Sequence, residues 1–158
     1  MLTIRKSRPA EANALAEASR EAFHSDVHYG APEEGGPPGY DDPEWQRRAM
    51  RWADYYTLRY GNDIIGGMIV IAKEPGHYEV GRIYIRPAWQ GRGLGAEAFE
   101  FLWHAYPLAR HWSLCTPRWN ARTRHFYVKR GFREIGETSD GLVLFERRMP
   151  SASGPSPA

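Results

Sequence analysis

Apolar and polar residues alternate along several short segments of this chain, and alternation of this kind predicts strands. The segments are residues 2–8, 55–60, 64–73, 79–85, 111–116, 132–137 and 142–149. Between them, apolar residues spaced three and four apart predict helices that begin at Pro9, Asp42, Gly93 and Asn120. Antiparallel hairpins therefore surround a central β-α-β-α unit. This order predicts an α/β fold with a mixed sheet flanked by about four helices.

The alternation slips by one residue inside the segment 79–85. Val80 and Ile83 are three positions apart, whereas Ile83 and Ile85 are two apart. A β-bulge at Gly81 and Arg82 would produce this slip, and glycine is a common site for a bulge. An edge distortion without function is the alternative interpretation of this slip.

Length and composition limit the class of protein. A chain of 158 residues predicts a single domain, here residues 1–150, followed by a disordered tail at 151–158 that reads Ser-Ala-Ser-Gly-Pro-Ser-Pro-Ala. The net charge of +2 does not favour a nucleic-acid partner. The longest apolar stretch, residues 64–72, is too short to span a bilayer. A single cysteine and an N-terminus without an apolar signal region favour a cytoplasmic location.

A glycine-rich turn joins the predicted strand at 79–85 to the predicted helix at 93–105. It reads Gln-Gly-Arg-Gly-Leu-Gly-Ala over residues 90–96. The first turn of a helix has unpaired N–H groups and a partial positive charge, and glycines let a phosphate approach them. Arg92 adds a fixed charge beside the turn. The segment is therefore predicted to bind a pyrophosphate.

Two common pyrophosphate motifs do not fit this turn. A dinucleotide fingerprint requires an acidic residue about 20 positions later. The sequence there is Leu-Cys-Thr, at residues 114–116. A P-loop requires Gly-Lys-Ser/Thr, which does not follow either.

The turn instead resembles the acetyl-CoA loop of the GCN5-related N-acetyltransferases, the GNAT superfamily. The family pattern Gln/Arg-x-x-Gly-x-Gly/Ala is matched by Gln90, Gly93 and Gly95. A second motif begins at Asn120 and reads Asn-Ala-Arg-Thr-Arg-His-Phe-Tyr-Val-Lys-Arg-Gly-Phe, with the family's seven-residue step from Asn120 to Tyr127. The two motifs occur in the family's order, and the resemblance covers roughly residues 2–149.

The resemblance implies the GNAT acyl-CoA N-acyltransferase fold, in which the bulge at 81–82 helps to separate its strand from the next and acetyl-CoA enters the gap. It also implies acetyl-CoA as co-substrate, and no metal is expected. The residues expected to bind acetyl-CoA are Ile83, Tyr84, Ile85, Gln90, Gly91, Arg92, Gly93, Leu94, Gly95, Ala96 and Asn120. One or two of the basic residues that flank the second motif are expected near the 3′-phosphate, the rest being solvated: Arg118, Arg122, Arg124, Lys129 and Arg130.

Acetyl transfer to an amine requires a neutral amine and a proton for the departing thiolate. The resemblance makes Tyr127 the candidate general acid, with ordinary core packing as the alternative. Glu79 lies eleven residues before Gln90, where histone-type members carry a catalytic glutamate, and it is the candidate base. A solvated strand residue is the alternative for Glu79.

Two other groups of residues are weaker candidates, one for a nucleophile and one for a metal site. Cys115 is expected to be a small buried apolar residue, because His111 lies four residues earlier on the same strand and cannot activate it. His24, Asp26 and His28 have the letters of metal ligands, but no third histidine or cysteine accompanies them at a usual spacing.

The segment 24–45 is acidic and holds no lysine or arginine. Its six acids give it a charge of −6, which leaves +8 on the rest of the chain. In the resembled family this region helps to form the acceptor site, so Tyr29, Glu33, Glu34 and Tyr40 are the expected acceptor-binding residues. A loop that is charged only for solubility would look the same.

These observations together predict an acetyl-CoA-dependent N-acetyltransferase that acts directly on a primary amine of a small, cationic molecule. Two alternatives stay open: acetylation of a protein N-terminus or lysine, and a non-catalytic acetyl-CoA-binding regulator. The expected partner is the small amine, with no nucleic acid and no membrane, and a homodimer is left open.

Overall fold

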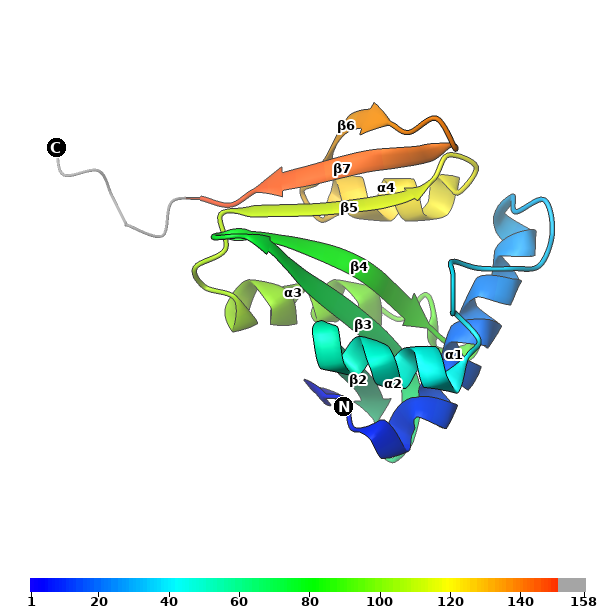
Figure 1. The fold of residues 1–158 in the computed structure, drawn as a ribbon. Helices are drawn as coiled ribbons and strands as arrows, with labels where there is room; N and C mark the ends of the chain where they lie inside the picture. The colour runs from blue at the N-terminus through cyan, green and yellow to red at the C-terminus, as the bar shows by residue number, and fades with distance from the viewer. Residues whose placement is uncertain (151–158) are drawn as a thin grey trace, which may run out of the picture.

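The computed structural model describes residues 1–150 and consists of one mixed sheet with helices on both faces (Figure 1). The sheet has seven strands in the order β1-β2-β3-β4-β5-β7-β6. All neighbouring strands are antiparallel except β4 and β5, which run parallel. The strands are β1 (Leu2–Lys6), β2 (Asp54–Tyr60), β3 (Asp63–Glu74), β4 (His77–Ile85), β5 (His111–Pro117), β6 (Arg133–Glu137) and β7 (Leu142–Arg148). The predicted mixed α/β architecture is thereby confirmed.

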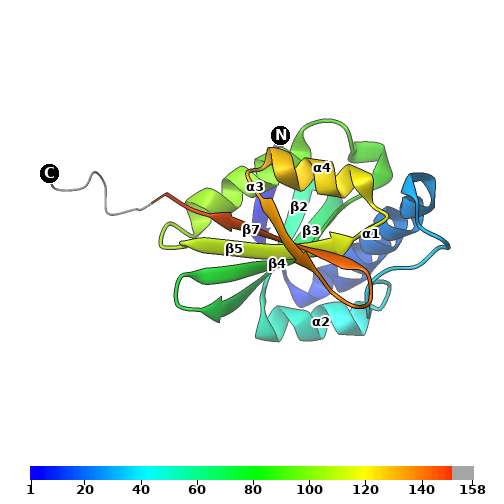
Figure 2. The same ribbon diagram turned by 90° about the horizontal axis from the view of Figure 1, so that it is seen from above.

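Two helices cover each face of the sheet (Figure 2). The four α-helices are α1 (Ala12–His24), α2 (Pro43–Trp52), α3 (Leu94–Ala105) and α4 (Ala121–Lys129). Helices α1 and α2 pack on one face with a core of residues such as Leu15, Ala49 and Ile69. Helices α3 and α4 lie on the other face over a larger core that includes Phe99, Trp112 and Phe145. The two faces of the sheet are therefore packed as two separate cores.

The sequence signals for helix ends are confirmed in their details. The Asp42 side chain accepts a hydrogen bond from the Glu44 N–H at 2.9 Å, and Pro43 is the first residue of α2. The Asn120 side chain caps α4 by accepting from the Thr123 N–H at 3.1 Å. Gly131 follows α4 with a φ of 91°, a conformation that glycine adopts without strain.

Three short 3₁₀ helices were not predicted as such: η1 (Pro9–Glu11), η2 (Ser25–Tyr29) and η3 (Pro87–Trp89). Segment η2 continues α1 into what the sequence indicated was a loop. The first glycine after α1 is Gly30, whose φ of 110° ends the turn, so the backbone can stay helical up to that point. This extension brings Asp26 and Tyr29 close to Arg122 of α4, across the sheet from α1.

The predicted bulge in β4 is confirmed. Ile69 of β3 lies opposite Arg82, while the next residue, Val70, lies opposite Val80, so Gly81 is the extra residue. Beyond this point β4 and β5 diverge: they pair over only three rungs, of which Glu79 with Ser113 is the last (Figure 1). The result is a wedge-shaped separation of the two strands, which we call the β4–β5 gap.

Candidate active site

The glycine-rich turn lies at the N-terminus of α3, beside the β4–β5 gap. Gly91 and Gly93 have φ values of 76° and 79°, and a Cβ atom on either would meet no other atom within 4 Å. The first hydrogen bond of α3 runs from the Glu97 N–H to the Gly93 carbonyl, so the N–H groups before Glu97 have no partner within the helix. The turn thus offers open space and free donors, which is what an approaching phosphate requires.

Arg92 does not reach into this space. Its guanidinium lies 4.7 Å from the centre of the Trp89 ring and donates to the Ala88 carbonyl at 3.1 Å. Arg92 is nevertheless exposed and lies between the two glycines.

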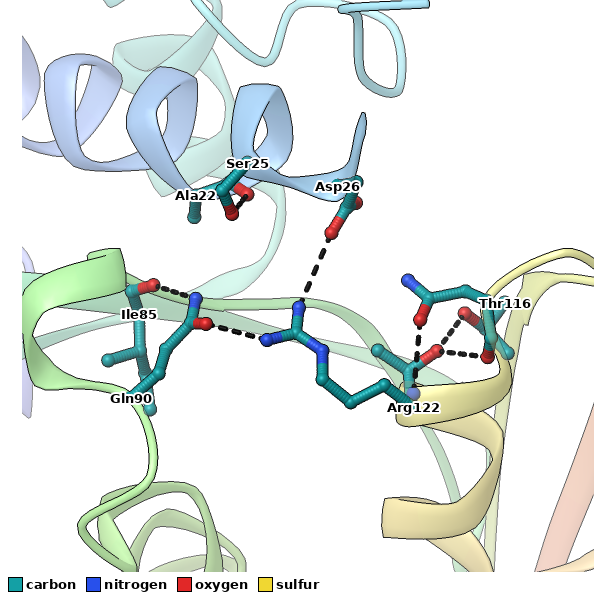
Figure 3. A network of polar contacts seen from close by, with 9 residues as sticks. Ala22, Ser25, Asp26, Ile85, Gln90, Thr116 and Arg122 are labelled. Atoms are coloured by element: carbon teal, nitrogen blue, oxygen red, sulfur yellow. Dashed lines mark hydrogen bonds and ion pairs between the residues drawn. The ribbon is translucent and has the colours of Figure 1, made fainter. Parts of the chain in front are cut away.

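Gln90 connects the turn to α4 through Arg122 (Figure 3). The Gln90 amide nitrogen donates to the Ile85 carbonyl at 2.8 Å, and its oxygen accepts from Arg122 Nη1 at 2.6 Å. A carbonyl only accepts and a guanidinium only donates, so this pair of contacts fixes the orientation of the amide. The two sequence motifs, which begin at Gln90 and Asn120, are therefore in direct contact.

Several predicted acetyl-CoA residues can contribute only their backbone. Tyr84 and Leu94 are each 4% exposed and belong to the cores, and the Tyr84 hydroxyl is hydrogen-bonded to that of Tyr55. Asn120 is also buried, and its oxygen is committed to the cap of α4. Among residues 1–150, in contrast, β4 beyond Glu79 has a neighbouring strand only on the β3 side, so its other edge is free for pairing.

Tyr127 extends from α4 into an aromatic cluster with Phe99, Phe132 and Phe145, with ring centres about 6 Å apart. The residue is 8% exposed. Burial raises the pKa of its phenol above the ordinary value, Cys115 and Asp26 add to the rise, and Arg122 opposes it. The phenol therefore holds its proton at neutral pH, although the shift makes it a weaker acid.

Glu79 lies on the last paired rung, where the β4–β5 gap begins. Its carboxylate is 3.7 Å from the Lys73 ammonium, and its side chain is 29% exposed. Its charge acts on the thiol of Cys115 across the gap. This places Glu79 at the closed end of the gap, with its side chain partly in solvent.

The expectation that Cys115 is buried is wrong. The residue is exposed, because it comes two positions after Ser113, where β5 has already lost β4 as a neighbour. The neighbouring residues Trp112 and Leu114 alternate with it and are buried on the α3 and α4 side. Partial burial and the charges of Glu79 and Asp140 raise the pKa of the Cys115 thiol, which disfavours the thiolate.

A polar cluster at the closed end of the gap was missed by the sequence analysis. The imidazoles of His77 and His111 stack with centres 4.2 Å apart, and His77 Nε2 lies 2.8 Å from the Ser113 hydroxyl. Burial and His77 lower the pKa of His111, while Glu146 at 3.3 Å opposes this shift. No short-range motif marks these residues, since strand pairing alone brings them together.

Half of the acidic side chains in the segment between α1 and α2 already make contacts within the fold. Of its acids, Asp26 contacts Arg122, Asp42 caps α2, and Glu44 pairs with Arg47. The other three acids are exposed: Glu33, Glu34 and Asp41.

The two aromatic residues expected to bind the acceptor also have partners. Arg122 lies 3.6 Å from the centre of the Tyr29 ring, and the Tyr40 hydroxyl is 2.7 Å from His24 Nε2. One face of Tyr29 is therefore already occupied by a cation of the protein itself.

Two surface hollows, of about 420 and 400 Å³, lie elsewhere and share Arg59 in their walls. Their arginines Arg59 and Arg86 are paired with the acids Glu11, Glu17 and Glu21. Neither hollow includes Tyr127 or Glu79, so the chemistry is better sought at the gap.

Within residues 1–150, no group of three or more His, Cys, Asp or Glu side chains is arranged to hold a metal ion. In the same residues, no helix combines the length and apolar character needed to span a bilayer.

Comparison with known proteins agrees with this geometry. The model of the acetyltransferase (GNAT) family matches residues 13–132. The uncharacterized protein YrkN of Bacillus subtilis is 26% identical over 102 residues, which cover 65% of this chain and 55% of the relative. An uncharacterized N-acetyltransferase in the pepI 3′ region of Lactobacillus delbrueckii subsp. lactis is 38% identical over 69 residues, or 40% of this chain and 38% of the relative. The chain thus spans about half or less of the length of the curated relatives it matches.

Solved structures share the fold. An acetyltransferase from Thermus thermophilus aligns with a TM-score of 0.80 at 19% identity, covering 94% of this chain and 97% of the other. The PaiA N-acetyltransferase from Thermoplasma acidophilum, solved in complex with coenzyme A, aligns with a TM-score of 0.76 at 17% identity over 94% and 99% of the two chains. At these identities the structures establish the fold, and the family match establishes the relationship. The chain belongs to the GNAT acetyltransferase family.

Proposed function

We propose that this protein is an acetyl-CoA-dependent N-acetyltransferase that transfers an acetyl group directly to a primary amine of a small, cationic molecule. The observation that carries the proposal is the hydrogen bond from Arg122 to Gln90. It joins the glycine-rich motif and the motif that contains Tyr127 at the open side of the β4–β5 gap, where one ligand can contact both.

The residues around the gap fit acetyl-CoA. The open space at Gly91 and Gly93 and the free N–H groups at the start of α3 suit its pyrophosphate. The unpaired edge of β4 at Ile83–Ile85 suits the amides of its pantetheine arm. Acetyl-CoA supplies the acetyl thioester, and the chain's own residues orient it and move protons.

In this proposal Tyr127 is the general acid. Its side chain extends from α4, next to β5 in the chain, the charges of Cys115 and Asp26 act on the phenol, and the phenol keeps its proton because burial raises its pKa. The proton goes to the thiolate sulfur as the C–S bond breaks. The direction of the pKa shift does not itself favour proton donation, so the role rests on the position of the hydroxyl.

Glu79 is the proposed base. It accepts a proton from the ammonium form of the amine, directly or through a water molecule, before the amine attacks. Its partial exposure beside the gap suits a group that passes protons to solvent.

A cationic acceptor is supported by Glu33, Glu34 and Asp41. These three exposed carboxylates have no ion-pair partner among residues 1–150, and the charges of Glu34 and Asp41 act on Tyr40. A negative wall raises the local concentration of a cationic amine.

An assay of free thiol release from acetyl-CoA with a panel of acceptors tests the function. The panel contains a polyamine, a neutral primary amine, an amino acid, and peptides with a free N-terminus or a free lysine. We expect the fastest amine-dependent release with the polyamine. Preference for a peptide would replace the small-molecule proposal. Acetyl-CoA binding without release by any acceptor would indicate a regulator.

A further inference from the structure

We propose that Arg122 is a positioning residue that couples the η2 segment to the acetyl-CoA loop, so that η2 and the loop are ordered as one unit. The inference rests on the proposed function in so far as residues 90–96 bind acetyl-CoA. It concerns a residue that the sequence motifs leave without a specific role.

The Arg122 guanidinium contacts two elements that lie far apart in the sequence, the turn after β4 and the η2 segment after α1 (Figure 3). Nη1 donates to Gln90 Oε1 at 2.6 Å, and Nη2 lies 3.4 Å from Asp26 Oδ1. The same guanidinium stacks on Tyr29 at 3.6 Å from the ring centre. One side chain therefore links η2, the glycine-rich turn and α4.

This arrangement requires an arginine. A planar guanidinium has separate donors for two partners and a flat face for an aromatic ring, whereas a lysine ammonium is a single point charge. Gln90 passes the link onward, because its amide also donates to the Ile85 carbonyl at 2.8 Å. The chain of contacts from Asp26 thus ends on the β4 backbone at the predicted pantetheine edge.

A gain in the stability of the fold does not explain the ion pair between Arg122 and Asp26. The Asp26 side chain is only 14% exposed, and its burial raises the pKa of the carboxyl more than Arg122 lowers it. An ion pair whose carboxylate is largely desolvated adds little net stability, because the cost of desolvation offsets the attraction. Holding two separate segments in one geometry is the remaining consequence of the contact.

A double-mutant cycle on coenzyme A binding tests the coupling. The variants are Asp26→Asn, Arg122→Ala and the double variant, and the dissociation constant is measured by calorimetry on the full chain. Asp26 has no direct contact with the turn, yet we expect Asp26→Asn to weaken binding about fivefold or more. In the Arg122→Ala background the same substitution should change affinity by less than about twofold. Arg122→Lys should not restore the affinity of the parent.

The pair of Arg124 and Glu134 provides a matched control. It joins the same helix to β6 at 3.6 Å, away from the turn, so Glu134→Gln should leave coenzyme A affinity unchanged. Additive effects of Asp26→Asn and Arg122→Ala would overturn the proposal. Tighter binding in Asp26→Asn would also overturn it, because it would mean that Asp26 merely withholds Arg122 from a phosphate. Failure of the parent protein to bind coenzyme A would refute the proposed function instead.

Discussion

Tyr127 and Glu79 stand in opposite environments at the same gap. The tyrosine is enclosed by phenylalanine rings, whereas the glutamate lies partly in solvent beside Lys73. A buried phenol keeps its proton and a partly solvated carboxylate can exchange protons with water. Different environments for two titratable groups are the usual basis for separate acid and base roles.

Tyr127→Phe should keep coenzyme A affinity and lower kcat by about 10²–10⁴, the usual contribution of a general acid. The ring remains packed among Phe99, Phe132 and Phe145, so the fold should not change. Calorimetry and steady-state kinetics measure the two effects separately. A kcat within a factor of two of the parent would remove the hydroxyl from the mechanism.

The raised pKa of Tyr127 also makes a pH prediction. An unperturbed phenol loses its proton near pH 10. Because burial raises the pKa of Tyr127 above that value, the phenol should stay protonated beyond pH 10. The alkaline limb of the parent's pH–rate profile below pH 10 should therefore also be present in the residual activity of Tyr127→Phe. A limb that disappears in this variant would show that Tyr127 itself titrates below pH 10 and would contradict the raised pKa of its phenol.

Glu79→Gln should lower the rate most on the acid side of the pH–rate profile, because protonated amine then has no acceptor for its proton. Glu74→Gln, an exposed glutamate on the same hairpin, is the control and should match the parent. If the Glu79 variant also keeps the parent's rate and profile, the base is water or another group.

Among the elements, the glycine-rich turn before α3 allows an effect on cofactor binding to be distinguished from an effect on stability. Gly93→Val puts a side chain at a φ of 79° in open space, which costs about 1–2 kcal/mol of backbone strain and obstructs an approaching phosphate. Gly141→Val, at a φ of 88° and also in open space, imposes similar strain on a distant hairpin. We expect both variants to lose stability and only Gly93→Val to lose coenzyme A affinity. Equal affinities would place the ligand elsewhere.

The close approach of β3 and β4 requires a glycine at position 66, which the sequence analysis did not identify. A Cβ on Gly66 would lie 2.1 Å from the Tyr84 carbonyl oxygen, so Gly66→Ala must push the two backbones apart. The expected loss is roughly 1–3 kcal/mol of unfolding free energy. Gly136→Ala is the control, because its Cβ would meet only Leu144 at 4.0 Å. Thermal unfolding of both variants checks this, and equal melting temperatures would contradict the close approach.

Local sequence patterns were sufficient to predict nearly all of the α-helices and strands. The caps at Asp42 and Asn120 and the slip at Gly81 are local signals, and each was found in the sequence. The missed features depend on pairing between distant segments. Cys115 is exposed because β4 leaves β5, and Arg122 meets Asp26 across 96 positions of chain. No window of sequence contains that information, so the linking contacts needed the structure.

Charge is unevenly distributed over the molecule as a whole. The segment 24–45 carries −6 and the rest of the chain +8. Three of its six acids are committed to contacts within the fold, which leaves Glu33, Glu34 and Asp41 to act on an acceptor. Any attraction from these exposed acids should be strongest at low salt, because ions screen it over about 8–10 Å near physiological ionic strength.

Neutralising Glu33, Glu34 and Asp41 to their amides should raise KM for a cationic amine at low salt and leave KM for acetyl-CoA unchanged. A control variant with Glu74, Glu100 and Glu134 changed to Gln removes the same charge from elsewhere on the surface. If both variants raise KM equally, the effect comes from net charge and the segment does not select the acceptor. An unchanged KM in both would leave the segment without a role in binding.

The proposed function depends on direct transfer from acetyl-CoA to an amine at the β4–β5 gap. Mass spectrometry of a single turnover, with enzyme in excess over acetyl-CoA and a polyamine present, tests it most directly. We expect the acetyl group to appear on the polyamine, the protein mass to stay unchanged throughout, and Tyr127→Phe to slow product formation. An acetylated protein that precedes the product, with the acetyl group on the exposed Cys115, would contradict direct transfer, as would hydrolysis of acetyl-CoA without acetylated amine.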